Sequence, residues 1–168
     1  MAESIQGATV DLHFLATMLN ALNVVTGAAP LDLRKTYNFT SGTGANKANA
    51  FWTDKRTLAA SANESLDLSG VLTDAFGATV TFTKLKALMV IADPGNVNDV
   101  VLGAGSNPWI GALGATSVLN VKPGGCCILV APDAVGMPIT ASTGDILKVA
   151  NSSSGTGVTY TIVALGEE

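Results

Sequence analysis

Hydrophobic and polar residues alternate along much of this chain, and the pattern is clearest in residues 66–92, LDLSGVLTDAFGATVTFTKLKALMVIA. Val80 and Phe82 alternate with threonines, as expected of a half-buried strand. Within residues 85–91 the apolar side chains occupy both phases, which predicts a strand buried on both faces. The change of phase near Lys84 and Lys86 predicts either a β-bulge or a strand that enters the interior from the surface. We interpret residues 85–91 as the central strand, which the rest of the chain must cover.

Turn residues divide the pattern into short strands. The segment DAFG lies between two strand-like runs, and its Gly77 can adopt a positive φ without steric cost, so we predict a hairpin there. Two more strand-turn-strand units are predicted as hairpins, one around the Pro-Gly-Gly turn and one around the NSSSGTG loop. Their strands are residues 117–121 with 126–131, and residues 145–150 with 158–165.

The N-terminal region is ambiguous between helix and strand. In residues 8–25 the leucines fit a helical period, whereas Val10, Leu12 and Phe14 fit an alternating strand. The flanking residues contain no convincing N-cap box, so an extended arm or edge strand is favoured. The segment TGAAP, residues 26–30, is expected to break the pattern before a strand-like run with one wet face begins at Leu31.

Eight or more short strands with about ten-residue spacing, and no convincing helix, predict an all-β fold. We expect an antiparallel β-sandwich, jelly-roll-like, with an N-terminal arm. Residues 1–30 form the expected arm and residues 31–168 the expected β-sandwich domain. No repeat of solenoid or propeller period is present, so one sandwich is the economical interpretation.

Composition makes an assembly the expected state. Only 13% of the 168 residues are charged, whereas 48% are hydrophobic, and typical soluble domains carry about 25% charged residues. Such a deficit predicts that part of the surface is buried against other subunits. The net charge of −4 and the lack of a basic cluster argue against a nucleic-acid partner.

The residues with metal-binding or nucleophilic chemistry are few. Cys126 and Cys127 are adjacent and poorly placed to bridge each other, so we expect small core residues. His13 lies far from them in sequence, which gives no support for a zinc site or a Cys-His pair. The loop at residues 93–99 carries oxygen ligands suited to calcium but lacks EF-hand spacing, so no metal and no cofactor are expected.

The N-terminus has no positive n-region, and the apolar segment after it is too short and too polar to span a bilayer. Synthesis in the cytosol and no membrane partner are therefore expected.

Two stretches of the chain resemble a family of tailed-bacteriophage virion proteins. They are RTLAASANESLDLSGVLTDAFGATVTFTKLKAL and VKPGGCCILVAPDAVGMPITASTGDILKVANSSSGTGVTYTIVALG. The resemblance implies a structural protein of the bacteriophage particle, in particular a capsid decoration or cement protein. Such a protein would be made in the host cytoplasm, lie on the capsid surface of the virion and bind the major capsid protein. The matching pieces are residues 67–70, 72–80, 123–125, 131–134, 144–147 and 150–151.

Protein-protein contacts are the expected role of the chain, with self-association as a homotrimer, since cement proteins sit at three-fold positions. The N-terminal arm carries apolar residues that need cover, and Trp109 lies on a Gly-rich loop where it could either contact a partner or cap the core. The candidate interaction residues are Leu12, Phe14, Leu15, Met18, Leu19, Leu22 and Trp109.

Two other functions compete with this one. A receptor- or glycan-binding module of a phage fibre or spike would stack its ligand on aromatic rings, and the candidates are Trp52, Trp109, Tyr37 and Tyr160. An enzyme is not expected, because the chain has one histidine and lacks GxSxG and HExxH motifs. A carboxylate pair for glycoside cleavage stays open, although each candidate is more simply a turn or cap residue: Asp54, Asp67, Asp74 and Asp145.

Overall fold

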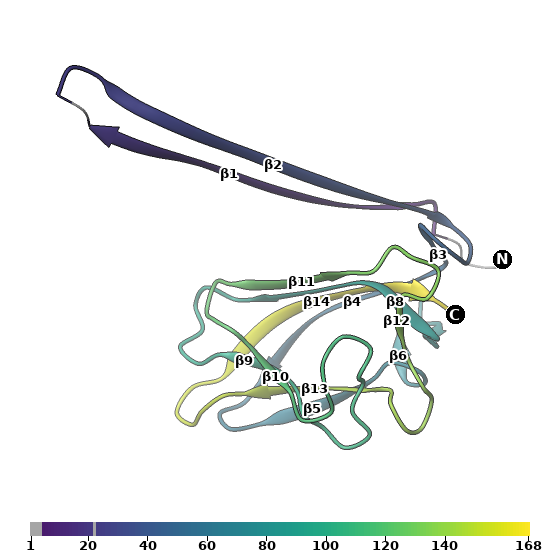
Figure 1. Cartoon of the computed structure of the whole chain (residues 1–168). Coiled ribbons are helices and arrows are strands. Elements are labelled where there is room, and N and C mark those ends of the chain that lie inside the picture. Colours follow the sequence, from purple (N-terminus) through teal and green to yellow (C-terminus); the bar gives the residue numbers. More distant parts are fainter. Residues whose placement is uncertain (1–4, 22) are drawn as a thin grey trace.

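The computed structural model describes residues 5–21 and 23–168, and within these ranges it consists of strands, turns and loops without a helix (Figure 1). Two antiparallel sheets face each other, which confirms the predicted all-β, sandwich-like fold. No helix in the described ranges is long and apolar enough to cross a membrane.

Each layer of the sandwich contains four main strands. The first sheet has the order β11 (Cys126–Val130), β8 (Lys84–Ala92), β14 (Val158–Glu167) and β4 (Ala50–Leu58), and the short β12 (Met137–Pro138) also pairs with β8. The second sheet has the order β10 (Val118–Val121), β9 (Val100–Gly103), β13 (Ile146–Asn151) and β5 (Asn63–Asp67).

The predicted central strand is β8, which lies between β11 and β14. Its register with β14 shifts by one residue, because Leu165 is opposite Ala87 whereas Gly166 is opposite Leu85. Lys86 is therefore the extra residue of a β-bulge, which is one of the two alternatives that the change of phase left open. The lysine itself is fully buried.

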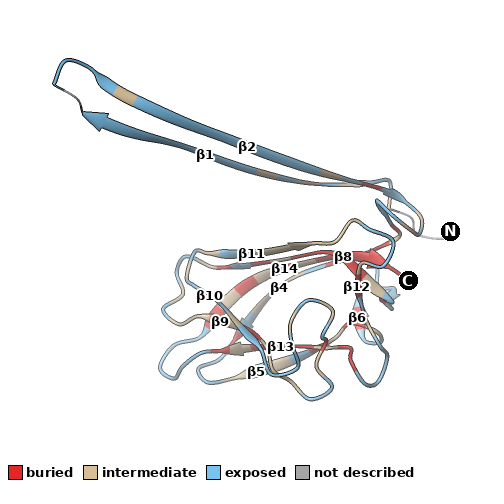
Figure 2. Cartoon of the chain, viewed as in Figure 1, coloured by how far each residue is buried: buried red, intermediate tan, exposed pale blue. Residues whose placement is uncertain are grey.

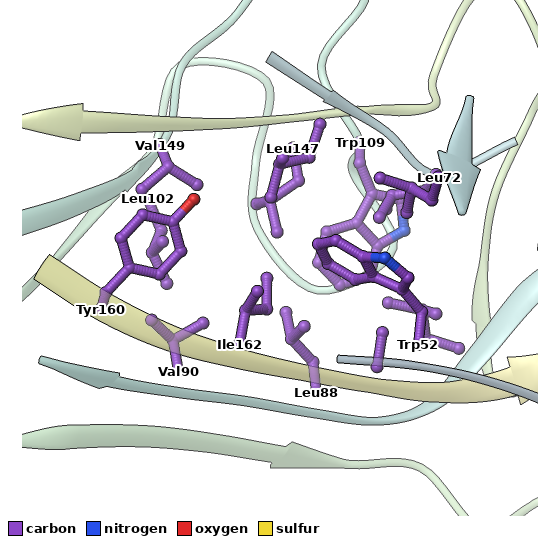
Figure 3. Close-up of a cluster of buried hydrophobic side chains, with 14 of the residues drawn as sticks. Trp52, Leu72, Leu88, Val90, Leu102, Trp109, Leu147, Val149, Tyr160 and Ile162 are labelled. Carbon is purple, nitrogen blue, oxygen red and sulfur yellow. The ribbon is translucent and has the colours of Figure 1, made fainter. Parts of the chain in front are cut away.

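The core fills the space between the two sheets (Figure 3). Side chains of the first sheet, among them Leu88, Tyr160 and Ile162, point toward Leu147 and Val149 of the second sheet. Alternate residues of each strand enter this core, as the period of two requires.

The turn at DAFG forms as predicted, between β6 (Leu72–Thr73) and β7 (Thr79–Val80), with Gly77 at φ 90°. The other two predicted hairpins are wrong. Their strands are present, but β10 and β11 belong to different sheets, as do β13 and β14. Connections of this length can cross the spacing of about 10 Å between packed sheets, and a turn sequence does not distinguish a crossing from a hairpin.

A long hairpin precedes the sandwich and consists of β1 (Ala8–Ala21) and β2 (Thr26–Ser41), with β3 (Lys47–Ala48) parallel to the end of β2. The segment TGAAP does not break the pattern as expected, because it is the first part of β2. Pro30 is tolerated there, opposite Thr17, because each strand of a two-stranded ribbon has one free edge. The predicted boundary between residues 30 and 31 falls within this strand.

The hairpin leaves the sandwich near the C-terminus and extends past its far end, in the view of Figure 1. Exposed residues make up most of its length, whereas buried residues appear only where it meets the sandwich (Figure 2). The hairpin is therefore a projection whose root alone is packed.

Cys126 does not lie in the core as expected, whereas Cys127 packs against the edge of the core. Cys126 is exposed and Cys127 is half-buried, and neither forms a disulfide. The reason is that β11 is the edge strand of its sheet, so it has fewer neighbours to cover it. Burial and the adjacent Cys126 raise the pKa of the Cys127 thiol.

Candidate functional site

The hairpin presents two chemically different faces. Residues directly opposite in an antiparallel pair share a face, and successive residues alternate between faces. The pairs Phe14–Leu33 and Ala16–Leu31 lie on one face, and His13–Arg34 and Leu15–Asp32 lie on the other. We call the first of these the apolar ribbon face. It consists of Leu12, Phe14, Ala16, Met18, Leu31 and Leu33.

Most of this face is open to solvent. Phe14 is 61% exposed, Met18 74% and Leu33 61%. Lys35 is the one charged residue on this face, and its ammonium lies 5.3 Å from the ring centroid of Tyr37, within the range of a cation–π contact. Large apolar side chains gathered on one exposed face are typical of a protein-interaction surface.

The predicted interaction residues separate into three groups. Leu12, Phe14 and Met18 belong to the apolar ribbon face, whereas Leu15 and Leu19 are exposed on the opposite face. Leu22 lies outside the described residues. The leucines and other apolar residues of β2 were missed as candidates, although their alternation in phase with β1 is visible in the sequence.

Trp109 occupies the second of its two expected positions, in the core. It is 2% exposed, and its Nε1 donates a hydrogen bond of 2.9 Å to the carbonyl oxygen of Pro138. The Gly-rich loop folds the indole back over the sandwich, so Trp109 presents no surface to a partner.

The opposite face of the hairpin carries an exposed cluster of charged groups. His13 Nε2 lies 2.9 Å from Asp32 Oδ1, and Arg34 Nε lies 3.1 Å from the same oxygen. Exposed pairs of this kind contribute little to stability. Their effect is to make this face of the ribbon more hydrophilic than the apolar ribbon face.

The root of the hairpin packs on the outside of the first sheet. Phe39 and Ala48 are buried together with Ala87 and Leu165. Of the five apolar residues packed around them, Val130 belongs to the first sheet and the other four to the hairpin and the residues just before it. We call this group the root cluster. It consists of Phe39, Ala48, Ala87 and Leu165, with Ile5, Ala8, Val10, Tyr37 and Val130 packed around them.

A buried carboxylate fixes the loop between β2 and β3 to the sandwich. Glu167 Oε1 accepts a hydrogen bond of 2.9 Å from the Gly44 amide and lies 3.0 Å from Lys86 Nζ. Lys84 Nζ lies 3.5 Å from Glu167 Oε2. The Lys86 ammonium also donates to the carbonyl oxygen of Asp133. Charge, hydrogen bonds and packing thus converge on the point where the hairpin leaves the sandwich.

The electrostatics of this contact are set by burial and by the donors. Burial raises the pKa of Glu167, but the Gly44 amide and the Lys86 and Lys84 ammonium groups outweigh it and hold the pKa below its usual range. The carboxylate is therefore ionised at neutral pH, and its charge strengthens the hydrogen bond that it accepts from the Gly44 amide.

The β-bulge that places Lys86 needs glycine on both sides. A Cβ at Gly136, which has φ 64°, would lie 2.8 Å from the Leu85 carbonyl oxygen. A Cβ at Gly166 would collide with the carbonyl oxygen of Lys84. Both glycines let the backbone approach closely enough to bury Lys86 beside Glu167.

The residues weighed for metal binding act as turn residues. Asp99 Oδ2 lies 2.6 Å from Lys122 Nζ, and Asp93 Oδ1 accepts a hydrogen bond of 2.9 Å from the Gly95 amide. Asn96 bonds through its side chain to both backbone polar groups of Thr159. No group of three or more metal-ligating side chains occurs in residues 5–21 and 23–168.

The candidate carboxylates for catalysis are tied to nearby donors. Asp54 pairs with Arg56 at 2.7 Å, and Asp67 Oδ1 accepts a hydrogen bond of 2.9 Å from the Ser69 amide. Asp74 Oδ1 accepts the amides of two residues in its own turn, and Asp145 Oδ2 accepts the Ser69 hydroxyl at 2.8 Å. Asp67, Asp74 and Asp145 thus have the turn roles expected of short acidic side chains. For Asp54 the expectation is wrong, because it lies within β4 and pairs with a residue of the same strand.

The aromatic rings weighed for glycan stacking are mostly inaccessible. Trp52, Trp109 and Tyr160 are buried in the core (Figure 3). The Tyr160 hydroxyl donates a 2.6 Å hydrogen bond to Glu64, and burial together with this bond raises the pKa of the phenol. Tyr37 is half-buried at the hairpin root.

An apolar hollow lies beside the root, between the edge of β4 and the turn that joins β6 to β7. It has a volume of about 1010 Å³, and Phe51 and Phe76 are its aromatic lining residues. Both phenylalanines are exposed.

Comparisons with known protein families, with curated proteins and with solved structures found no match to this chain.

Proposed function

We propose that this chain is a structural protein of a bacteriophage virion, in particular a capsid decoration or cement protein. It would bind between subunits of the major capsid protein and associate with itself as a homotrimer. The observation that carries the proposal is the hairpin, a long projection with one exposed apolar face and a firmly packed root.

The topology of the sandwich supports the same proposal. In chain order the eight sandwich strands are β4, β5, β8, β9, β10, β11, β13 and β14. Numbered one to eight, they give sheets in the order 1-8-3-6 and 2-7-4-5. This is the order of a jelly roll, and we propose that fold for the chain. Jelly rolls are frequent in viral capsid proteins.

A cement protein that binds between capsid subunits needs no reactive group. Shape complementarity, apolar contact area and backbone pairing are sufficient for its binding. The low content of charged residues, 13%, suits a chain whose surface is partly covered by neighbours. The alternative, a receptor- or glycan-binding module of a fibre or spike, has less support because three of its four candidate aromatic rings are buried.

Antibody labelling of virions tests the location. We expect label over the head, at a fixed ratio to the major capsid protein measured by quantitative mass spectrometry of purified particles. Label at the tail tip would contradict the proposal and favour the fibre alternative. Light scattering of the purified protein should give three times the chain mass of 17.0 kDa.

A further inference from the structure

A second apolar surface lies on the outside of the first sheet, and the hairpin covers only one end of it. The residues of β8 that face away from the core are Ala87, Met89 and Ile91, and register partners extend this face onto both neighbouring strands. Met89 is half-buried and Ile91 is exposed. We call this surface the outer sheet face. It consists of Ala87, Met89, Ile91, Cys126, Ile128, Val130, Val163 and Leu165.

The hairpin and this surface already contact each other within one chain. In the root cluster, Val10, Tyr37 and Phe39 of the hairpin pack with Ala87 and Leu165 of the outer sheet face. Along the hairpin, the side that carries Val10 and Tyr37 continues into the apolar ribbon face. Along the first sheet, the outer sheet face continues from the root cluster toward Ile91. Both apolar surfaces therefore run on past the root cluster, but within one chain they contact each other only at the root cluster.

Geometry prevents the chain from completing this contact by itself. The hairpin diverges from the first sheet after the root (Figure 1), and the Glu167 contact with Gly44 and Lys86 fixes its point of departure. At ~3.4 Å per residue the fourteen residues of β1 span about 48 Å, against about 31 Å for the nine of β8. The ribbon therefore reaches beyond its own sandwich.

We propose that the apolar ribbon face of one chain packs on the outer sheet face of a second copy. The inference rests on the self-association within the proposed function and names the surfaces that carry it. Each copy then donates one hairpin and accepts one. Such a contact closes into a ring when the rotation between neighbouring copies divides a full turn, and the proposed homotrimer is the ring of three. Charge does not oppose the contact at its centre, since Lys35 is the one charged residue on the ribbon face and the eight residues of the outer sheet face include none. Lys55 of β4 lies on the same side of the first sheet and borders this surface.

Two neighbouring substitutions test which face of the ribbon makes the contact. Phe14 and Leu15 are 61% and 65% exposed and lie on opposite faces. Phe14→Lys and Leu15→Lys change the net charge equally, and the second places lysine opposite Asp32, where it is well tolerated. By sedimentation equilibrium, Phe14→Lys should raise the dissociation constant at least tenfold and Leu15→Lys less than threefold. Equal effects of the two variants, or a monomeric unmodified chain, would overturn the inference.

Cross-linking tests which chain receives the hairpin. One chain carries Leu33→Cys, Cys126→Ser and Cys127→Ala, and the other carries Cys127→Ala alone, which leaves Cys126 on the outer sheet face. A short bismaleimide should give a product of twice the chain mass in the mixture. Thr17→Cys, on the opposite ribbon face, replaces Leu33→Cys in the control and should give at least fivefold less.

A third chain combines Leu33→Cys with the natural Cys126 and carries Cys127→Ala. If it cross-links within itself at high dilution, the hairpin closes on its own sandwich and the inference is wrong. These measurements use the isolated protein, so they can contradict the inference while virion labelling still places the chain on the capsid. Conversely, labelling at the tail tip would contradict the proposed function and leave the hairpin contact between copies unaffected.

Discussion

The N-terminal hairpin and the sandwich are both antiparallel β-structure with apolar residues on alternate positions, but only the sandwich has a second layer. Phe82 is 1% exposed in the sandwich, whereas Phe14 in the hairpin is 61% exposed. The local pattern is the same at both places. What differs is whether the fold supplies an opposing surface within the same chain.

A ribbon of two strands is marginal in water, because its backbone pairs do not offset the entropy of ordering the chain. The hairpin is supported at its root by the root cluster and by the buried Glu167. Beyond the root, an external surface would supply the missing layer. The comparison therefore separates residues that stabilise the fold from residues that are available for assembly.

The largest difference is expected from the same substitution made in both regions. Phe82→Ala should lower the free energy of unfolding by about 3–5 kcal/mol, because it leaves a cavity in the core. Phe14→Ala should change it by less than about 0.5 kcal/mol in the dissociated protein. Urea denaturation below the association concentration measures both. Similar losses for the two variants would show that the distal hairpin is packed against its own sandwich.

Ile162→Ala is the control for the placement of β14. Ile162 is fully buried between the sheets, so its truncation should cost about 3 kcal/mol. A neutral result for both core variants would contradict the sandwich as described.

The second prediction concerns the junction of the two regions. Glu167→Gln removes the charge partner of Lys86, which is fully buried. Removing one partner of a buried pair costs about 3 kcal/mol, because the other charge stays in the interior. Denaturation should show this loss at neutral pH. Exchange of the Gly44 amide with deuterium should also accelerate, since its acceptor becomes a weaker one.

Arg34→Gln is the matched control, because Arg34 also pairs with a carboxylate but on the exposed face of the ribbon. This change should alter the free energy of unfolding by less than about 0.5 kcal/mol. If Glu167→Gln is as mild as the control, the buried pair does not hold the root.

The third prediction follows from the lowered pKa of Glu167. A carboxyl whose folded pKa is below its unfolded value of about 4.3 stabilises the fold above that pH, and the stabilisation is lost as pH falls through the folded pKa. Stability should therefore decrease below about pH 4. Asp133 titrates in the same direction, since the amides of Gly136 and Val135 lower its pKa.

The variant Glu167→Gln separates these two carboxyls. The difference in free energy of unfolding between the natural chain and the variant should shrink as pH falls from 5 to about 3. A difference that stays constant over this range would mean that the pKa of Glu167 is not lowered on folding.

Sequence patterns predicted the parts of the fold that depend on neighbouring residues. The two-phase apolar run around Leu88 identified the central strand, and the phase change near Lys86 allowed either a bulge or a strand that enters from the surface. Pairing between distant segments was not predictable in this way, so β10 and β11 were expected to form a hairpin although they lie in different sheets. A turn such as Pro-Gly-Gly fixes where the chain reverses and leaves the partner strand open.

The candidate site was predictable in part for the same reason. Alternation in β1 identified Phe14 and Met18 as candidates. Leu31 and Leu33 of β2 alternate in the same way, but they were not assigned to the same ribbon because Pro30 suggested a break before them. Nothing local marks Lys86 and Glu167 as partners, since 81 positions separate them and the bulge alone brings them together. Trp109 shows the converse, because a Gly-rich loop around an aromatic residue is compatible with both a surface and a core position.

The smallest effect on the fold should come from shortening the hairpin. Asp11 and Thr36 are directly opposite, so residues 12–35 can be replaced by Asn-Gly, which closes a tight two-residue turn. The shortened chain keeps Val10, Tyr37 and Phe39 and with them the root cluster. Its free energy of unfolding should stay within about 0.5 kcal/mol of the dissociated full-length protein, since the removed residues are largely exposed.

Association should be lost in the same shortened chain, because the entire apolar ribbon face has been removed. Sedimentation velocity at the concentration where the full-length protein is oligomeric provides the measurement, with circular dichroism as the check on folding. A shortened chain that still associates would place the self-contact on the sandwich. A shortened chain that fails to fold would instead make the hairpin part of the folding core, although its apolar residues are exposed, and the separation between the two regions would not hold.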